Sequence, residues 1–319
     1  MTAFPAVVNL GALGGVQGSV IQGRISNDRI GFSTAWLGDV NGDGLPDWGV
    51  AGRYALPLGN NGLPIFPPIS VASVASAYVL LSGQAAPAAW DLASQPAYRI
   101  GDLPSGWYQS PIEMAGAGDL NGDGFDDIVV GSLEADNNGR ANSGGAMIYH
   151  GGAGGPSLAF QVHGAYAGNL TGISVSGLGD VHGDGLADIA LASQAFTPFP
   201  GSGPASSTHV ILGRAGARGD VDLLNPDSTV WRIDSPSGYL QRSVVSGAGD
   251  MNGDGFADLA IGHLFADANG RTDSGSISVV FGRANATGAL AVGSAGAGSF
   301  RIDGANCVLL KLMNNLFKN

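Results

Sequence analysis

The sequence predicts an all-β fold built from four repeats of one four-stranded unit. Glycine is abundant, with 54 residues in a chain of 319, and short apolar runs alternate with turn residues. One motif also occurs four times, as GDVNGDGLPDWGV, GDLNGDGFDDIVV, GDVHGDGLADIAL and GDMNGDGFADLAI. The copies begin at Gly38, Gly118, Gly179 and Gly249, and intervals of this length suit four short strands with their connections.

Each copy of the motif is flanked by segments that we expect to be strands. A β-like segment precedes it, such as 243–249, and three apolar segments follow. The first continues the motif directly, at 48–51, 128–131, 189–192 and 259–262. The second ends near a glycine, at 78–81, 147–150, 209–212 and 278–281. The third alternates in character and has five copies, at 20–22, 98–100, 160–162, 231–233 and 300–304.

These segments define one repeat domain, residues 1–304, with complete units at 9–82, 83–151, 152–213 and 214–282 and the start of a fifth at 283–304. The tail, residues 305–319, differs in composition, because it holds the only cysteine, Cys307, and both lysines, Lys311 and Lys318. Its apolar spacing fits a short helix. Either the tail caps the last edge of the repeats, or it interrupts a longer repeat protein. The abrupt change in composition favours the second interpretation.

The motif has the composition of a cation-binding loop. With its first aspartate as position 1, every copy has Asp at positions 1, 5 and 9, Gly at position 6, and Asn or His at position 3. Several carboxylate and carbonyl oxygens that converge in a tight loop suit Ca²⁺. An EF-hand is excluded, because position 12 holds an apolar strand residue instead of the bidentate Glu. A metal-free Asx-rich hairpin is the alternative, but the recurrence of all three aspartates favours metal.

We name these copies loop 1 (39–47), loop 2 (119–127), loop 3 (180–188) and loop 4 (250–258), and we expect up to four Ca²⁺ ions. Loop 3 is expected to bind most weakly, because the imidazole of His182 is a poor ligand for a hard cation. Water would then complete that site, and His182→Asn would raise its affinity. The expected ligands occupy positions 1, 3, 5, 7 (through the backbone carbonyl) and 9: Asp39, Asn41, Asp43, Leu45, Asp47, Asp119, Asn121, Asp123, Phe125, Asp127, Asp180, His182, Asp184, Leu186, Asp188, Asp250, Asn252, Asp254, Phe256 and Asp258.

Composition argues against several classes of protein. The net charge is −12, which the loop aspartates nearly account for, and an acidic chain without a basic stripe argues against nucleic acid as a partner. No apolar run is long enough for a membrane-spanning helix, and residues 1–10 lack the pattern of a signal peptide. Because there is a single cysteine, disulfides do not hold the fold together.

With these strands and loops, the chain resembles the FG-GAP repeat family, the integrin α-chain type of β-propeller, in its bacterial form. The resemblance covers about residues 9–304 and is carried by FRIDG at 300–304, SVVSGAGDMNGDGFADLAIGH at 243–263 and SGSISVVFG at 274–282. It implies radial four-stranded blades, with the Ca²⁺ loop between the first and second strands of each. Four blades plus one extra strand would form an incomplete ring. The resemblance also implies an extracellular or cell-surface location and adhesive or binding roles.

The leading functional hypothesis is a calcium-binding adhesion or ligand-binding module, in which metal-clamped hairpins hold variable loops toward a protein or glycan. Those loops are 56–70 and 196–203. Trp107, Tyr108 and Tyr239 are candidate contact residues, although large aromatics more often pack between blades. A structural spacer in a large secreted repeat protein is an alternative. An open blade edge would also favour self-association.

Catalysis is the remaining alternative, because FG-GAP blades accompany hydrolases in some proteins. No Gly-x-Ser-x-Gly elbow is present, and Asp126 with Asp127 could imitate an acid and base. Metal ligation by Asp127 and solvation of Asp126 is the favoured interpretation. We therefore expect no enzymatic activity in this chain, which would at most be an accessory part of a secreted hydrolase. The histidines share no metal-ligand spacing: His150, His163, His182, His209 and His263.

Overall fold

The computed structural model describes residues 20–23, 30–52, 76–82, 89–92, 98–100, 112–194, 206–235, 243–292 and 298–304. Within these ranges the chain consists of strands and their connections, with one 3₁₀ turn, η2 (Ala268–Gly270), so the predicted all-β class is confirmed. The described part holds no helix that is long and apolar enough to cross a bilayer. The features predicted at 56–70, 196–203, Trp107, Tyr108, Tyr239 and 305–319 lie outside the described residues.

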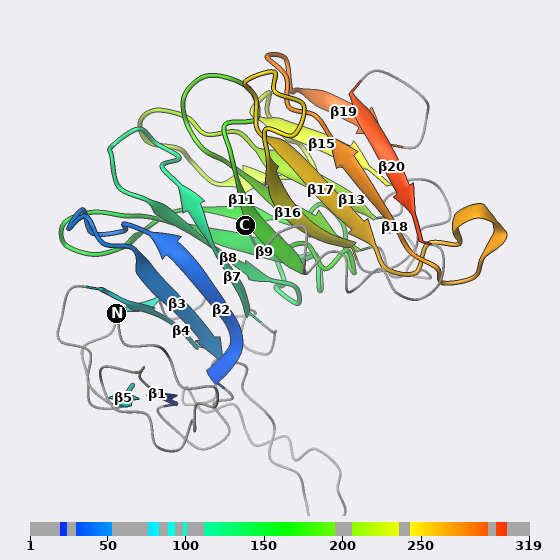
Figure 1. Ribbon diagram of the computed structural model, residues 1–319. Helices are drawn as coiled ribbons and strands as arrows, with labels where there is room; N and C mark the ends of the chain where they lie inside the picture. Colours follow the sequence, from blue (N-terminus) through cyan, green and yellow to red (C-terminus); the bar gives the residue numbers. More distant parts are fainter. Residues whose placement is uncertain are drawn as a thin grey trace, which may run out of the picture.

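Four sheets, each built on four antiparallel strands, are the blades of a propeller, so the predicted four-bladed arrangement is confirmed (Figure 1). Blade 1 contains β2 (Ile30–Gly38), β3 (Asp47–Gly52), β4 (Ser76–Leu80) and β6 (Tyr98–Ile100). Blade 2 contains β7 (Ile112–Gly118), β8 (Asp127–Ser132), β9 (Gly145–His150) and β10 (Ser157–His163). Blade 3 contains β11 (Ser174–Gly179), β12 (Asp188–Ser193), β13 (Ser207–Ile211) and β15 (Val230–Asp234). Blade 4 contains β16 (Ser243–Gly249), β17 (Asp258–His263), β18 (Ser276–Val280) and β20 (Ser299–Asp303).

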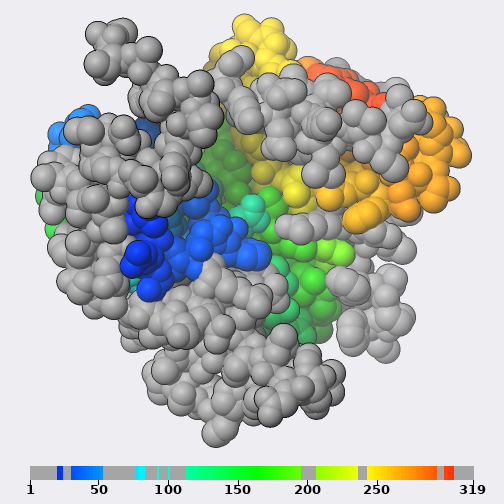
Figure 2. Space-filling view, turned by 60° about the horizontal axis from the view of Figure 1, so that its bottom comes forward, coloured from blue at the N-terminus to red at the C-terminus, as the bar shows by residue number. Residues whose placement is uncertain are grey.

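The blades follow one another in chain order. Their first strands are neighbours, because β7 contacts β2 on one side and β11 on the other, and β11 in turn contacts β16. In the space-filling view, blade 1 (blue) and blade 4 (orange) lie on either side of the green surface of the middle blades (Figure 2). The loops between first and second strands are therefore carried by four neighbouring strands.

The sheets differ from the predicted units by one strand. The units at 9–82, 83–151, 152–213 and 214–282 end after the third strand of a sheet, whereas β6 pairs with β4 and belongs to blade 1. Strands β10, β15 and β20 close the other blades in the same way. The fourth strand comes just before the next blade in the sequence, and the prediction therefore assigned it to the following unit. The sequence pattern carried no information about which neighbour it pairs with.

Short additional strands join neighbouring blades. Strand β14 (Val221–Asp222), in the connection between β13 and β15, pairs in parallel with β10 of blade 2. Strand β19 (Gly288–Ala291) of blade 4 pairs in the same way with β15 of blade 3. Strand β5 (Ala89–Asp91) of blade 1 makes the equivalent pairing with β1 (Val20–Gln22), an early copy of the fourth-strand type. Backbone pairing thus covers the outer edges of β10 and β15.

The core lies between the blades, because the second strands of blades 2, 3 and 4 bury both of their faces. In β8, Ile128 and Val130 pack with Leu37 of blade 1, and Val129 packs with Ile189 of blade 3. These side chains are almost completely buried. Burial of each contributes about 1.5–3 kcal/mol, so the interfaces between blades supply most of the apolar stabilisation.

Glycines allow the first strands to approach one another closely. A Cβ on Gly116 would lie 2.8 Å from the carbonyl oxygen of Trp36, and one on Gly177 would lie 2.4 Å from that of Gly116. Blade 1 has Trp36 at the equivalent position. The indole of Trp36 is 56% exposed and lies edge-to-face against Trp48, with ring centroids 4.7 Å apart. Blade 1 therefore presents a different outer face from blades 2 and 3.

Candidate metal-binding loops

The four loops occupy the same place in their blades. Loop 1 joins β2 to β3, loop 2 joins β7 to β8, loop 3 joins β11 to β12, and loop 4 joins β16 to β17. In each hairpin the register shifts just before the loop. Glycines at positions 4 and 6 have positive φ, for example +79° at Gly122 and +88° at Gly124. This backbone conformation produces the tight turn that brings alternate side chains together.

The aspartate at position 1 organises the loop backbone. In loop 2, Oδ1 of Asp119 accepts hydrogen bonds from the amides of Gly122 at 2.7 Å and Asp123 at 3.2 Å, and Oδ2 accepts one from Gly124 at 2.9 Å. Together with the amide of Asn121, 3.3 Å from Oδ1, these backbone amides hold the Asp119 carboxylate at the centre of the turn. The equivalent aspartates of the other loops accept the same bonds from positions 4, 5 and 6: Asp39, Asp180 and Asp250.

The aspartate at position 9 connects the loop to the third strand. The Asp127 side chain is buried, and its Oδ2 accepts a hydrogen bond from the amide of Leu120 at 2.8 Å. Its Oδ1 accepts one from Gly151, at the end of β9, at 2.9 Å. The same two bonds recur in the other blades at Asp47, Asp188 and Asp258.

Burial makes this carboxylate difficult to ionise without a cation. Desolvation is the main cause that raises the pKa of Asp127 to about 7 despite its two amide donors, and the nearby charges of Asp123 and Asp119 contribute to this rise. Burial likewise raises the pKa of Asp47 and of Asp188. A divalent cation among the three aspartates of a loop would favour their charged forms. Position 9 therefore indicates a cation more strongly than the exposed positions do.

Positions 3 and 5 complete an all-oxygen donor set in loops 1, 2 and 4. In loop 2, Nδ2 of Asn121 donates to Oδ2 of Asp123 at 2.9 Å, and Oδ1 of Asn121 accepts from the amide of Asp123 at 2.8 Å. Loops 1 and 4 repeat both contacts. The side chains at positions 3 and 5 thus contact each other in these three loops, and carboxylate, amide and carbonyl oxygens are the donors that Ca²⁺ prefers.

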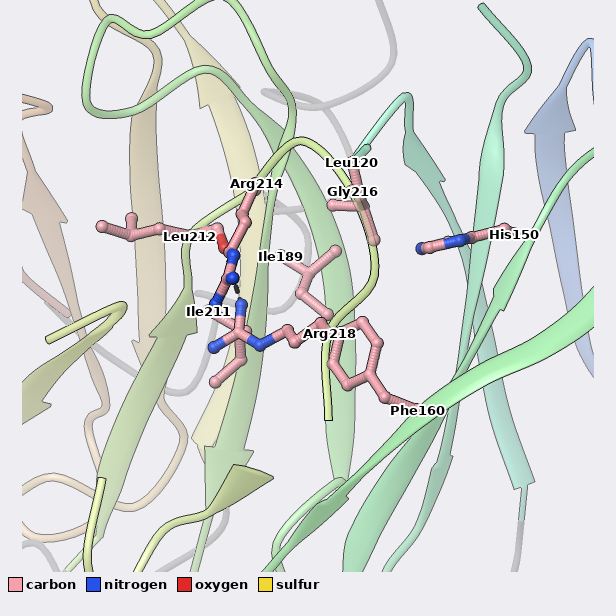
Figure 3. Close-up of a pocket in the computed structure, with 10 residues that line it drawn as sticks. Leu120, His150, Phe160, Ile189, Ile211, Leu212, Arg214, Gly216 and Arg218 are labelled. Atoms are coloured by element: carbon pink, nitrogen blue, oxygen red, sulfur yellow. Dashed lines mark hydrogen bonds between the residues drawn. The ribbon is translucent and has the colours of Figure 1, made fainter. Parts of the chain in front are cut away.

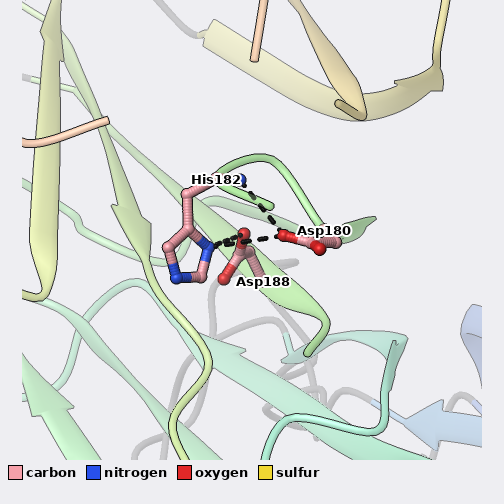
Figure 4. Close-up of side chains that lie close together, drawn as sticks. All are labelled: Asp180, His182 and Asp188. Atoms are coloured by element: carbon pink, nitrogen blue, oxygen red, sulfur yellow. Dashed lines mark hydrogen bonds and ion pairs between the residues drawn. The ribbon is translucent and has the colours of Figure 1, made fainter. Parts of the chain in front are cut away.

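Loop 3 differs because the ring of His182 lies among carboxylates (Figure 4). Its Nδ1 is 3.1 Å from Oδ2 of Asp188 and 3.5 Å from Oδ1 of Asp180, and its Nε2 is 2.9 Å from Oδ2 of Asp184. Burial lowers the pKa of His182, but the three carboxylates outweigh it, and the net shift is upward. Among the described residues, Asp180, His182 and Asp188 form a group whose potential ligand atoms all lie within 4.8 Å of one another.

The structure also reveals contacts between neighbouring loops that the sequence did not predict. The side chain at position 7 of each following loop covers the glycine at position 4 of the preceding loop. A Cβ on Gly42 would lie 2.6 Å from Cε1 of Phe125, and one on Gly183 would lie 2.5 Å from Cε1 of Phe256. The invariant NGDG or HGDG pattern was the available signal, since position 4 is Gly in all four copies.

Backbone hydrogen bonds reinforce these contacts. The amide at position 8 of one loop donates to the carbonyl at position 1 of the preceding loop: Asp126 to Asp39, Ala187 to Asp119, and Ala257 to Asp180, at 2.8–3.0 Å. In addition, Oδ2 of Asp126 accepts a hydrogen bond from the amide of Asp39 at 2.7 Å. The prediction that Asp126 is simply solvated is therefore wrong, because its carboxylate links blade 2 to blade 1.

The other histidines do not form a second cluster with these loops. His209 and His263 are buried, and desolvation lowers the pKa of each to about 4. His150 lines a small cavity between blades 2 and 3, where the guanidinium of Arg218 lies over the ring of Phe160 (Figure 3). That cavity measures about 10 Å³. It has room for a water molecule but not for an organic substrate.

The fold and the loops define a class, a propeller of aspartate-rich repeats, and comparison with known proteins identifies the repeat. Residues 115–148 and 244–280 match the FG-GAP repeat family, so the chain contains FG-GAP repeats, as predicted. The matched ranges lie in blades 2 and 4, the two blades with Phe at position 7 of the loop.

Two known proteins show partial similarity. Phosphatidylinositol-glycan-specific phospholipase D of Bos taurus is 28% identical over 191 residues, which are 56% of this chain and 22% of that protein. Integrin alpha-E of Mus musculus is 41% identical over 88 residues, which are 25% of this chain and 8% of that protein. The chain thus spans about a fifth of the first relative and less than a tenth of the second.

Proposed function

We propose that this chain is a Ca²⁺-stabilised, non-catalytic binding module that acts outside the cell or at its surface. The observation that carries the proposal is the repeated structure of loops 1, 2 and 4, in which the aspartate at position 9 is buried and the aspartate at position 1 is held by backbone amides in the same tight turn. The similarity to integrin alpha-E supports an adhesive role and an extracellular location.

In loop 2, Ca²⁺ would be held by Asp119, Asn121, Asp123, the carbonyl of Phe125, and Asp127, and the other loops offer the corresponding residues. The bound ion supplies positive charge that offsets the repulsion among the three carboxylates. The contacts within the chain then transmit this constraint beyond the loop. Asp127 joins the loop to the end of β9, and contacts between loops extend this constraint to the next blade.

A rigid set of hairpins would give the connections between strands a fixed geometry, which is what a ligand-binding surface requires. We expect the partner to be a protein or a glycan recognised by these connections. The similarity to a phospholipase D favours one second candidate, an accessory part of a secreted hydrolase. A structural spacer is the third, and self-association through a blade edge would accompany a spacer more readily than a ligand-binding role.

Calorimetry on the metal-free chain tests the Ca²⁺ proposal. Ca²⁺ should bind at several sites, and the double variant Asp119→Asn, Asp123→Asn should lose one equivalent. Asp136→Asn is the matched control, because Asp136 lies in the same blade, accepts a backbone hydrogen bond from Asn142, and is outside the four loops. Equal stoichiometry in the double variant and the wild type, or no Ca²⁺ binding by the wild type, would contradict the proposal.

The binding role needs a separate experiment. An array of glycans and of extracellular proteins, probed with Ca²⁺ and then with EDTA, should give signals that depend on Ca²⁺. Signals that are absent in both conditions would favour the spacer. Turnover of a phospholipid or glycan substrate by the isolated chain would show that the non-catalytic assignment is wrong.

A further inference from the structure

Loop 3 has a different donor set from the other three loops. At position 3, loops 1, 2 and 4 have Asn, whose side chain contacts the aspartate at position 5. His182 instead directs Nδ1 toward Asp180 and Asp188, the aspartates at positions 1 and 9. A nitrogen donor thus stands at the centre of a loop that otherwise offers oxygen, and Ca²⁺ strongly prefers oxygen ligands.

The second ring nitrogen of His182 is held by another carboxylate. Its Nε2 lies 2.9 Å from Oδ2 of Asp184, and the opposite oxygen of Asp184 accepts the amide of Leu186 at 2.9 Å. In the tautomer that donates from Nε2 to Asp184, the lone pair of Nδ1 faces Asp180 and Asp188. Histidines that bind metals usually donate their other ring N–H to a carboxylate in this way, which fixes the ring and increases its basicity.

The distances between the donor atoms fit a small transition-metal ion. Two ligands bound tetrahedrally to one Zn²⁺ at its usual bond lengths lie about 3.4 Å apart. Nδ1 of His182 is 3.1 Å from the oxygen of Asp188 and 3.5 Å from that of Asp180. One imidazole with two carboxylates is also a donor set typical of Zn²⁺ and chemically similar ions.

We propose that loop 3 is a site for a transition-metal ion of the Zn²⁺ class, bound by Nδ1 of His182, Asp180 and Asp188, with Asp184 positioning the imidazole. The inference rests on the proposed metal-binding role of the loops, and it assigns a different metal to one of them. The protein would then carry Ca²⁺ in loops 1, 2 and 4 and a Zn²⁺-class ion between loops 2 and 4.

The test uses the full chain saturated with Ca²⁺ and titrates Zn²⁺ by calorimetry, with Co²⁺ absorption as a second readout of nitrogen and oxygen coordination. The wild type should bind one Zn²⁺ per chain. His182→Asn should lower the Zn²⁺ affinity at least tenfold and add one equivalent of Ca²⁺. This variant recreates the loop 1 pattern, so it is expected to fold. His163→Gln is the matched control and should bind Zn²⁺ as the wild type does.

Three results would overturn the inference: no Zn²⁺ binding by the wild type, equal binding by His182→Asn, or displacement of the Zn²⁺ by millimolar Ca²⁺. In the first case the imidazole would serve as a metal-free partner of the three carboxylates. These experiments can contradict the Zn²⁺ inference without contradicting the proposed Ca²⁺-binding function, and the reverse. Zn²⁺ binding that depends on His182, in a chain that binds no Ca²⁺, would support the former and contradict the latter.

Discussion

The ring of Phe256 in loop 4 lies directly over Gly183 in loop 3, so closely that a Cβ on Gly183 would be 2.5 Å from Cε1 of the ring. The equivalent contact joins Phe125 to Gly42, and Leu186 takes the same place over Gly122. Loops 1, 2 and 3 are thus each covered by the loop that follows. Metal binding in one loop would consequently order a surface on which the next loop packs.

Gly183→Ala should destabilise the protein through this contact. The substitution places a methyl group against Phe256, and overpacking of this kind costs about 1–3 kcal/mol. Gly183 also has a φ of +83°, which is unfavourable for alanine. Denaturant unfolding measures the total loss of stability.

Gly253→Ala is the matched control for backbone strain. Gly253 is the equivalent residue of loop 4, with a φ of +75°, and a Cβ there would have no neighbour within 4 Å. Both variants should lose stability through backbone strain, but only Gly183→Ala also overpacks against Phe256. We therefore expect the larger loss of unfolding free energy in Gly183→Ala. Equal losses would show that the Phe256 contact contributes nothing.

Asp126→Ala should weaken the connection between blades 1 and 2. The substitution removes the acceptor for the Asp39 amide, and such a hydrogen bond contributes about 0.5–1.5 kcal/mol. Alanine fits at this position, since Ala187 and Ala257 occupy it in blades 3 and 4. Because Asp39 is a proposed ligand, the Ca²⁺ affinity of loop 1 should also fall. Unchanged unfolding and unchanged Ca²⁺ affinity would together refute this role of Asp126.

Stability should fall in mild acid because of His209 and His263. Burial lowers the pKa of both to about 4, whereas an unfolded histidine titrates near its usual value of 6.5. The unfolded state therefore binds more protons below about pH 6.5, and stability decreases until about pH 4. Each histidine contributes up to ~3 kcal/mol of this loss.

The double variant His209→Met, His263→Ser should reduce the dependence on pH. These residues are the ones that blade 2 has at the equivalent positions, Met147 and Ser132. Urea unfolding of the wild type and the variant at pH 7.5 and pH 5 is the measurement. An identical loss of stability in both proteins would exclude the buried histidines as its cause.

The sequence predicted the features that are encoded within one short segment, such as the metal-binding loops. Asp119, Asp123 and Asp127 lie in one short segment, so their spacing alone predicted a tight loop, and the amide hydrogen bonds to Asp119 and Asp127 show that turn. The contact of Phe125 with Gly42 joins two blades, and the glycine at position 4 does not identify the residue that packs on it. The pairing of β6 with β4 was missed for the same reason, since it depends on which neighbouring sheet the strand reaches. The ring orientation of His182 depends on three carboxylates and was likewise beyond a pattern of residue types.

The melting temperature in Ca²⁺ and in EDTA tests the central claim most directly. At a hundredfold excess over Kd, each ion stabilises the folded state by about 2.7 kcal/mol, so three sites contribute about 8 kcal/mol. For a domain of this size, that corresponds to a fall in melting temperature on the order of 15 °C when EDTA removes the metal. We predict such a fall, reversed when Ca²⁺ is restored. A melting temperature that is the same in excess Ca²⁺ and in EDTA would contradict the account.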